Sequence, residues 1–232
     1  MALNTGYWNR DANIEWCEYL LHPYEYSYYI AEFWNTLSSF FIVIIGYWEF
    51  HRNYFEKKLI IPLITTGIGS MIFHATQSYI GQIIDELSMV LIAFTLLNQL
   101  HKKNMNIIHY LQFMIFSIIY IRTLNFIFFM ICFSILTILI MHKCYKITQC
   151  NKIYNDILII GTVGFTISVL LFWIPEKIFC YQNSPIDVFH FHALWHLLSV
   201  VSLRYVFMFA HYNYKKIIFK TTLHFNESDF II

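Results

Sequence analysis

The chain has 232 residues, of which 58% are hydrophobic and only 12% are charged, and its mean hydropathy is +0.54. Soluble domains carry about a quarter charged residues, so this composition is typical of an integral membrane protein. The formal net charge is +1, and no block of Lys and Arg resembles a nucleic-acid patch. The composition therefore excludes nucleic acid as a partner and predicts that the bilayer surrounds the chain.

The first thirty residues are polar and lack the apolar core of a cleavable signal peptide. Apolar runs follow that approach the length needed to cross a bilayer, about 20 residues. Read as one helix, the run 105–141 would measure roughly 55 Å against a hydrocarbon core of about 30 Å, so we expect a turn at Arg122-Thr123. The sequence thus predicts one all-α domain (1–232), a seven-transmembrane helix bundle. Its parts are a tail at 1–30, spans at about 31–50, 59–76, 82–100, 105–121, 124–141, 156–175 and 188–211, and a tail at 212–232.

Basic residues orient these spans, because Lys and Arg gather in cytoplasmic segments. With the N-terminus outside, the outer segments hold only Arg10, Arg122 and Lys177, and Arg204 lies within the last span. The sequence therefore predicts a luminal or extracellular N-terminus and a cytoplasmic C-terminus. The inner segments then hold Arg52, Lys57, Lys58, Lys102, Lys103, Lys143, Lys146, Lys152, Lys215, Lys216 and Lys220.

This topology brings polar residues from three spans to one depth of the outer leaflet. GSMIFH ends the second span with Ser70 and His74, and DELSM begins the third with Asp85. FHALWH begins the seventh span with His192 and His196. We therefore expect these five side chains to meet near the outer face.

Three histidines and an aspartate in this arrangement point to a catalytic zinc site. Positions i and i+4 of a helix share one face, so His192 and His196 can bind one ion, and His74 supplies a third ligand. Zinc with three histidines and water is the open, catalytic type of site. Asp85 is then the candidate base for the water, and Ser70 the candidate donor to the oxyanion.

Each of these residues also has a simpler interpretation. A lone histidine at a helix end is more often an interfacial residue that is hydrogen-bonded to water, and Asp85 can mark a solvated helix start. A carboxylate within a span costs about 2.5–3.5 kcal/mol on insertion scales, and such residues are usually functional. For the four residues taken together, metal binding is the favoured interpretation.

The tail before the first span carries clustered glutamates at positions 15, 18, 25 and 32. Carboxylates with backbone carbonyls suit a hard cation such as calcium. An acidic, solvated segment explains the spacing equally well, and the pattern is not that of an EF-hand.

Five cysteines are present, and Cys17 and Cys180 fall on the outer side of the predicted topology. That side is oxidising in the secretory pathway, so either a disulfide between them or five free cysteines fits the sequence. Cys132, Cys144 and Cys150 lie in a span or in a cytoplasmic loop, where we expect free thiols.

An ordered series of motifs resembles the alkaline ceramidase family, within the superfamily of seven-span zinc hydrolases that includes the adiponectin and progestin receptors. The motifs are GYW (6–8), EWCE (15–18), IAEFWNTLSS (30–39), GSMIFH (69–74), DELSM (85–89), FW…IFC (172–180) and FHALWH (191–196). They cover nearly the whole chain, and the combination of IAEFWNT, GSxxFH and FHAxWH is the specific part.

The resemblance implies a membrane amidase that cleaves ceramide, taken from the bilayer, to sphingosine and a fatty acid. It implies zinc bound by His74, His192 and His196, with Asp85 beside the metal water and Ser70 nearby. It places the protein in the endoplasmic reticulum or Golgi membrane, with the plasma membrane as the alternative. No obligate protein partner is implied.

The resemblance also implies a calcium site and a disulfide. The family's calcium ligands fall on Glu15, the backbone carbonyl of Trp16, Glu18 and Glu32. A further family ligand, an asparagine, falls on Leu20, whose side chain cannot bind an ion. Glu25 is the candidate substitute. Ser88 replaces the proline that many members have in this motif. The family's cysteine pair falls on Cys17 and Cys180.

Two other functions fit the same residues. One is a seven-span lipid receptor or binding protein with a structural zinc, and the other is a hydrolase of another lipid amide or ester. Ligand-independent amide hydrolysis separates the receptor from an enzyme. The short C-terminal stretch LHFNESDFII offers little surface for signalling partners, which favours an enzyme.

Overall fold

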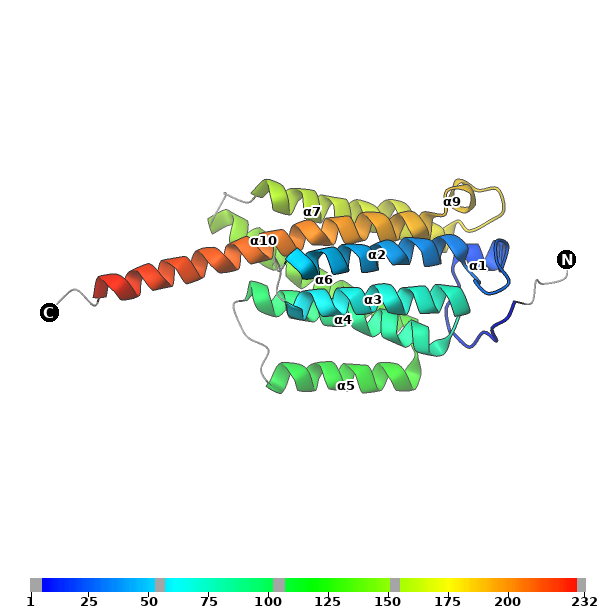
Figure 1. The fold of residues 1–232 in the computed structure, drawn as a ribbon, viewed down its shortest axis with the longest axis horizontal. Helices are drawn as coiled ribbons and strands as arrows, with labels where there is room; N and C mark the ends of the chain where they lie inside the picture. The colour runs from blue at the N-terminus through cyan, green and yellow to red at the C-terminus, as the bar shows by residue number, and fades with distance from the viewer. Residues whose placement is uncertain (1–5, 53–56, 102–106, 151–154, 229–232) are drawn as a thin grey trace.

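A computed structural model describes residues 6–52, 57–101, 107–150 and 155–228, apart from the side chains of Cys150 and 213–228. This part of the chain is all-helical, which confirms the predicted class (Figure 1). Its helices are α1 (Cys17–Leu21), α2 (Phe33–Arg52), α3 (Lys57–Thr76), α4 (Tyr79–Leu100), α5 (Ile107–Thr123), α6 (Phe126–Cys150), α7 (Asn155–Ile167), the π-helix η2 (Ser168–Trp173), α8 (Ile174–Ile178), α9 (Pro185–Val188) and α10 (Phe191–Ser228).

Five helices are long and apolar enough to cross a membrane: Lys57–Thr76, Tyr79–Leu100, Phe126–Gln149, Asn155–Ile178 and Phe191–Tyr212. α5 is apolar but has only 17 residues, and α2 is not among the five. Each of the seven predicted spans nevertheless falls on a helix. The membrane character of the chain is therefore supported, whereas the count of seven crossings stays a prediction.

The long apolar run breaks where α5 meets α6. Leu124 adopts a left-handed conformation with φ 42°, and its N–H donates to the carbonyl oxygen of Tyr120 at 2.7 Å. Asn125 Oδ1 then accepts the N–H of Phe128 at 3.0 Å and caps the start of α6. Leu124 and Asn125 therefore separate the two helices, directly after the predicted turn at Arg122-Thr123.

Small residues bring α3 and α4 together at the end that carries the predicted site. A Cβ atom added to Gly69 would lie 2.6 Å from the backbone nitrogen of Asp85, and one added to Gly81 would lie 2.5 Å from that of Phe73. Only glycine permits these approaches. They place the last turns of α3 against the first turns of α4.

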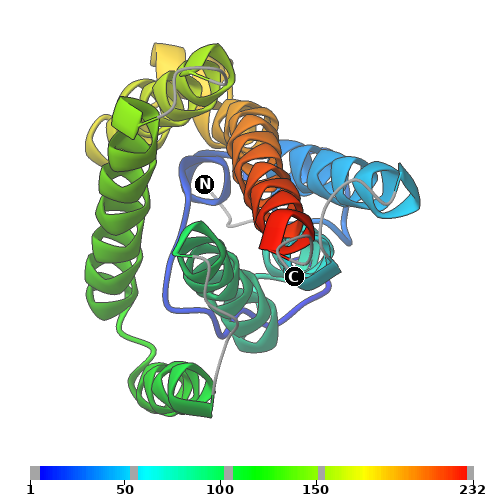
Figure 2. The ribbon, with the colours of Figure 1, turned by 90° about the vertical axis from the view of Figure 1, so that its left-hand side faces the viewer.

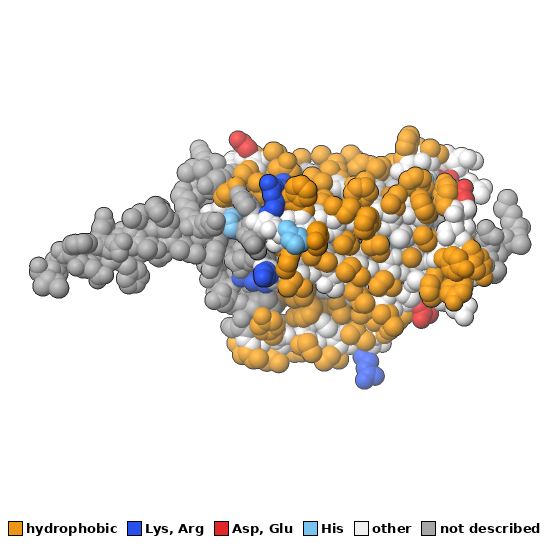
Figure 3. Space-filling model, in the orientation of Figure 1, with side chains coloured by type: hydrophobic (Ala, Val, Ile, Leu, Met, Phe, Trp, Pro, Cys, Tyr) orange, Lys and Arg blue, Asp and Glu red, His pale blue; other side chains and the backbone are white. Residues whose placement is uncertain are grey.

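Different elements mark the two ends of the bundle. The N-terminus, α1 and α9 lie at one end, and α10 runs toward the C-terminus at the other (Figure 1). Seen along the helix axes, α10 lies near the middle and α5 at the periphery (Figure 2). The flank between the ends is mainly hydrophobic, as expected of a surface that faces lipid (Figure 3).

The basic residues that set the predicted orientation are only partly described. Arg52 and Lys57 end α2 and begin α3, at the end of these helices away from α1. The orientation of the termini therefore remains a prediction. Lys102, Lys103 and Lys152 lie outside the described residues, as do the side chains of Lys215, Lys216 and Lys220.

Candidate metal centre

Three histidines from α3 and α10 meet inside the bundle. His74 lies in the last turn of α3, and His192 and His196 lie in the first two turns of α10. Each offers a ring nitrogen, and these atoms all lie within 4.8 Å of one another. Their exposed fractions are 0%, 2% and 2%. Within the described residues, this is the one group of three or more His, Cys, Asp or Glu so arranged.

The hydrogen bond of His74 leaves one ring nitrogen free for a metal. Its Nδ1 contacts the buried carboxylate of Glu32, which follows the tail and precedes α2. A carboxylate only accepts hydrogen bonds, so the proton sits on Nδ1 and Nε2 keeps its lone pair. That Nε2 is buried and has no hydrogen-bond partner among the described residues. A histidine backed by a carboxylate in this way is a common metal ligand.

His196 is held in the same tautomer by a hydroxyl group. Its Nδ1 lies 2.8 Å from Ser38 Oγ, and Ser38 donates its own hydrogen to the carbonyl oxygen of Asn35 at 3.0 Å. Ser38 therefore accepts from Nδ1–H, and Nε2 is again unprotonated.

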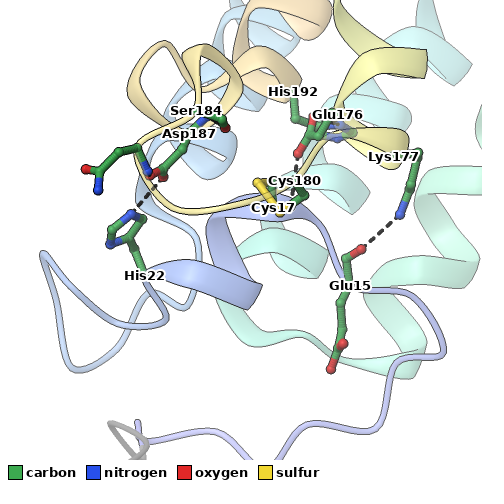
Figure 4. The surroundings of a disulfide bond; sticks show 10 residues. Glu15, Cys17, His22, Glu176, Lys177, Cys180, Ser184, Asp187 and His192 are labelled. Atoms are coloured by element: carbon green, nitrogen blue, oxygen red, sulfur yellow. Dashed lines mark hydrogen bonds and ion pairs between the residues drawn. A yellow bond between two sulfur atoms is a disulfide. The ribbon is translucent and has the colours of Figure 1, made fainter. Parts of the chain in front are cut away.

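His192 faces a buried glutamate that the sequence analysis did not single out. Its Nδ1 lies 3.3 Å from Oε2 of Glu176, and both atoms lack a hydrogen-bond partner in the described structure. The other oxygen of Glu176 accepts the N–H of Cys17 at 3.0 Å (Figure 4). The Trp16 ring covers His192, with the ring centroids 3.8 Å apart.

Asp85 and Ser70 lie beside the histidines, at the contact between α3 and α4. The Ser70 hydroxyl interacts with the Asp85 carboxyl group and lies 3.0 Å from the hydroxyl of Ser39. Both residues are buried and line one hollow together with His196. The structure thus brings together all five residues that the sequence places at this depth.

The predicted calcium ligands have separate partners. Glu15 pairs with Arg10 at 2.8 Å, while the carboxylate of Glu18 accepts the N–H groups of Trp34 and Asn35 at 2.8 and 2.9 Å. Glu18 thereby caps α2; its burial, together with the nearby Glu32, raises its pKa to about 8.

The remaining predicted calcium ligands are occupied as well. The Trp16 carbonyl accepts the N–H of Leu20 at 3.1 Å, and Glu32 contacts His74. Calcium binding at the tail stays a prediction, and Glu32 Oε1 is buried without a hydrogen-bond partner in the described part of the chain.

A disulfide joins Cys17 to Cys180, as the resemblance implied. It ties α1 to the segment that follows α8, next to Glu176 (Figure 4). Cys132 and Cys144 are free thiols, as predicted, and the side chain of Cys150 lies outside the described residues. A second tie lies nearby, where His22 Nε2 is 2.7 Å from Oδ1 of Asp187.

The sequence is also similar to those of known proteins. The family model described as Ceramidase matches residues 9–224. The chain belongs to the ceramidase family. Mouse alkaline ceramidase 3 is 28% identical, with 84% of this chain and 81% of the mouse protein aligned. The alkaline ceramidase of Arabidopsis thaliana is 29% identical over 80% of this chain and 77% of its own length. That of Drosophila melanogaster is 26% identical over 87% and 77%. Membership of the ceramidase family confirms the resemblance drawn from the motifs.

Proposed function

We propose that this protein is a zinc-dependent amidase that hydrolyses ceramide to a sphingoid base and a free fatty acid within the membrane. The observation that carries the proposal is the group of three buried histidines beside Asp85 and Ser70 in a chain of the ceramidase family. Relatives named alkaline ceramidase across most of the chain support the substrate.

The residues fit a zinc ion. His74, His192 and His196 would hold it, because each ring is backed at Nδ1 by Glu32, Glu176 or Ser38 and can present its other nitrogen. Zinc bound by three imidazoles supplies a Lewis acid and makes water nucleophilic near neutral pH. Calcium at Glu15, Trp16, Glu18 and Glu32 is proposed as a second, regulatory ion.

Asp85 and Ser70 carry out the proton transfers and stabilise the oxyanion. Asp85 takes a proton from the attacking water as the water oxygen bonds to the amide carbon. Ser70 steadies Asp85 before attack and donates to the developing oxyanion afterwards. When the C–N bond breaks, Asp85 returns the proton to the leaving nitrogen, so that the products are an amine and a carboxylic acid.

The proposal places this chemistry at the outer leaflet. The histidines, the disulfide and the N-terminus share one end of the bundle, which is luminal or extracellular in the predicted orientation (Figure 1). A disulfide fits an oxidising compartment, which supports an endoplasmic reticulum or Golgi membrane.

Hydrolysis of a fluorescent ceramide by the purified protein in detergent tests the proposal, with zinc content measured on the same samples. We expect wild type to bind zinc and turn over, and His196→Ala to lose both. His142→Ala is the matched control, because His142 lies on α6 away from the site. Zinc without hydrolysis of any ceramide favours the receptor or another lipid substrate, and absence of zinc in wild type overturns the metal site.

A further inference from the structure

We propose that two adjoining hollows receive the two chains of ceramide, and that Glu86 recognises the hydroxyl groups of the sphingoid base. The inference rests on the proposed function and deepens it. The two hollows share part of their lining, and each has further lining residues of its own. The shared residues are Asp85, Met89, Phe133, Thr137, Phe165 and Trp195.

The inner hollow runs from the metal centre into the middle of the bundle. It is narrow, about 110 Å³, and Ser70, Asp85 and His196 lie at its start. Leu203 and Val206 also line it; Val206 is about 15 Å farther along α10 than His196 at ~1.5 Å per residue.

The threonine hydroxyl groups that line the inner hollow already donate their hydrogen bonds within their own helices. Thr66 donates to the carbonyl of Pro62 at 2.9 Å, and Thr162 to that of Leu158 at 2.8 Å. Thr137 likewise donates to its own helix, at 2.9 Å. Such a narrow, apolar passage suits an unbranched hydrocarbon chain.

The lateral hollow is wider, about 440 Å³, and lies between α4, α6, η2 and α10. His192, Asp85 and Glu86 lie at its inner end. Ile138 and Leu170 also line it, and they are 65% and 55% exposed on the flank of the bundle. This hollow therefore connects the metal centre with the surface that faces lipid.

Glu86 is a buried carboxylate that the proposed reaction does not use. It is 5% exposed, and it accepts hydrogen bonds from Gln82 Nε2 at 3.0 Å and from the Tyr120 hydroxyl. Each carboxylate oxygen has two acceptor positions, so capacity remains toward the hollow. Burying a carboxylate in a span is costly, which marks Glu86 as functional rather than incidental.

The chemistry of ceramide decides which chain goes where. The sphingoid base carries hydroxyl groups on the carbons that flank its nitrogen-bearing carbon, whereas the common fatty acyl chain has only its carbonyl near the amide. A hydroxyl donor needs an acceptor at the inner end of its hollow. Ser70 and Asp85, at the start of the inner hollow, are engaged in the proposed reaction, whereas Glu86 lines the lateral hollow and takes no part in it. The acyl chain then occupies the inner hollow.

The first test pairs Glu86→Gln with ceramide and with an analogue that lacks the terminal hydroxyl of the sphingoid base. A hydrogen bond to a charged group is worth about a tenfold change or more, so we expect kcat/KM for ceramide to fall by at least about tenfold. The wild type should hydrolyse the analogue more slowly than ceramide. Glu86→Gln should slow hydrolysis of the analogue little further, and the zinc content of the variant should equal that of the wild type. Equal losses on ceramide and on analogues lacking either hydroxyl overturn the role of Glu86.

The second test separates the chains by length. Ala93 lines only the inner hollow and Ser134 only the lateral hollow. We expect Ala93→Leu to lower the rate on long-acyl relative to short-acyl ceramides, and Ser134→Leu to discriminate by length of the sphingoid base instead. Ala93→Val is a milder replacement should the leucine impair folding.

The outcomes separate this inference from the proposed function. Reversed or identical selectivity of the two variants overturns the assignment of the chains while leaving ceramide hydrolysis intact. Failure of wild type to hydrolyse any ceramide overturns the proposed function itself.

Discussion

Glu176 connects the N-terminal tail with the histidine cluster, because its Oε2 lies 3.3 Å from His192 Nδ1 while its Oε1 accepts the N–H of Cys17. One buried carboxylate thus touches a proposed metal ligand and the residue that carries the disulfide. Its removal would free the imidazole ring to rotate and would leave the Cys17 N–H without its acceptor.

We expect Glu176→Gln to lower zinc affinity by about 10–100-fold, the usual effect of losing a partner behind a metal ligand. Competition with a chromogenic chelator measures this without reference to activity. Glu25→Gln is the matched control, since Glu25 is a half-exposed tail carboxylate that pairs with His22. Unchanged affinity in Glu176→Gln would show that Glu176 serves the tail alone.

Asp85→Asn should retain zinc and lose turnover by roughly 10²–10⁴-fold, the typical contribution of a general base. The amide side chain keeps the shape of the carboxylate and can still hydrogen-bond Ser70, so the fold should persist. Metal content and single-turnover hydrolysis of ceramide are measured on one preparation. Asp156→Asn, on an exposed position of α7, serves as the control. Full activity in Asp85→Asn rules out the base role.

Reduction of the disulfide should lower the melting temperature of the protein in detergent. The bond closes a loop between residues 163 apart, and removing a native disulfide typically costs about 2–5 kcal/mol of stability. The double variant Cys17→Ser/Cys180→Ser should melt at the same lower temperature with or without reductant. Cys132→Ser should respond to reductant as wild type does, and a reductant-insensitive wild type would contradict the role of the bond.

Calcium should alter zinc affinity if it binds at the tail, because Glu32 is both a predicted calcium ligand and the partner of His74. An ion that recruits Glu32 competes with the imidazole for the same carboxylate, so we expect the zinc dissociation constant to change on calcium addition. Glu15→Gln and Glu18→Gln should abolish that change. Equal zinc affinities with and without calcium in wild type count against the tail site.

The histidine cluster was predictable because its residues carry local signals. The spacing of His192 and His196 places both rings on one helix face, and the predicted topology brings His74 to the same depth. That the run 105–141 breaks followed from bilayer thickness, and the polar pair Arg122-Thr123 placed the break within two residues of where it lies, at Leu124 and Asn125. Ser70 and Asp85 were also placed correctly beside the histidines.

The residues behind the ligands carried no such signal. Ser38 reaches His196 across 158 positions, and Glu176 meets His192 only after α8 turns the chain back toward α10. Such pairs depend on helix packing, which a hydropathy pattern does not specify. The tail glutamates are a case in which sequence spacing does not specify the contacts: Glu18 lies near Glu32, whereas Glu15 pairs with Arg10.

The position of Cys180 also bears on the order of biosynthesis. Cys17 precedes every predicted span, and Cys180 precedes α10, which carries two of the three proposed metal ligands. The disulfide includes none of the proposed metal ligands, so the chain can fasten its tail before any ion binds. The disulfide can form without the ion, so metal binding becomes a late step of maturation. A chelator can then block metal binding without preventing formation of the disulfide.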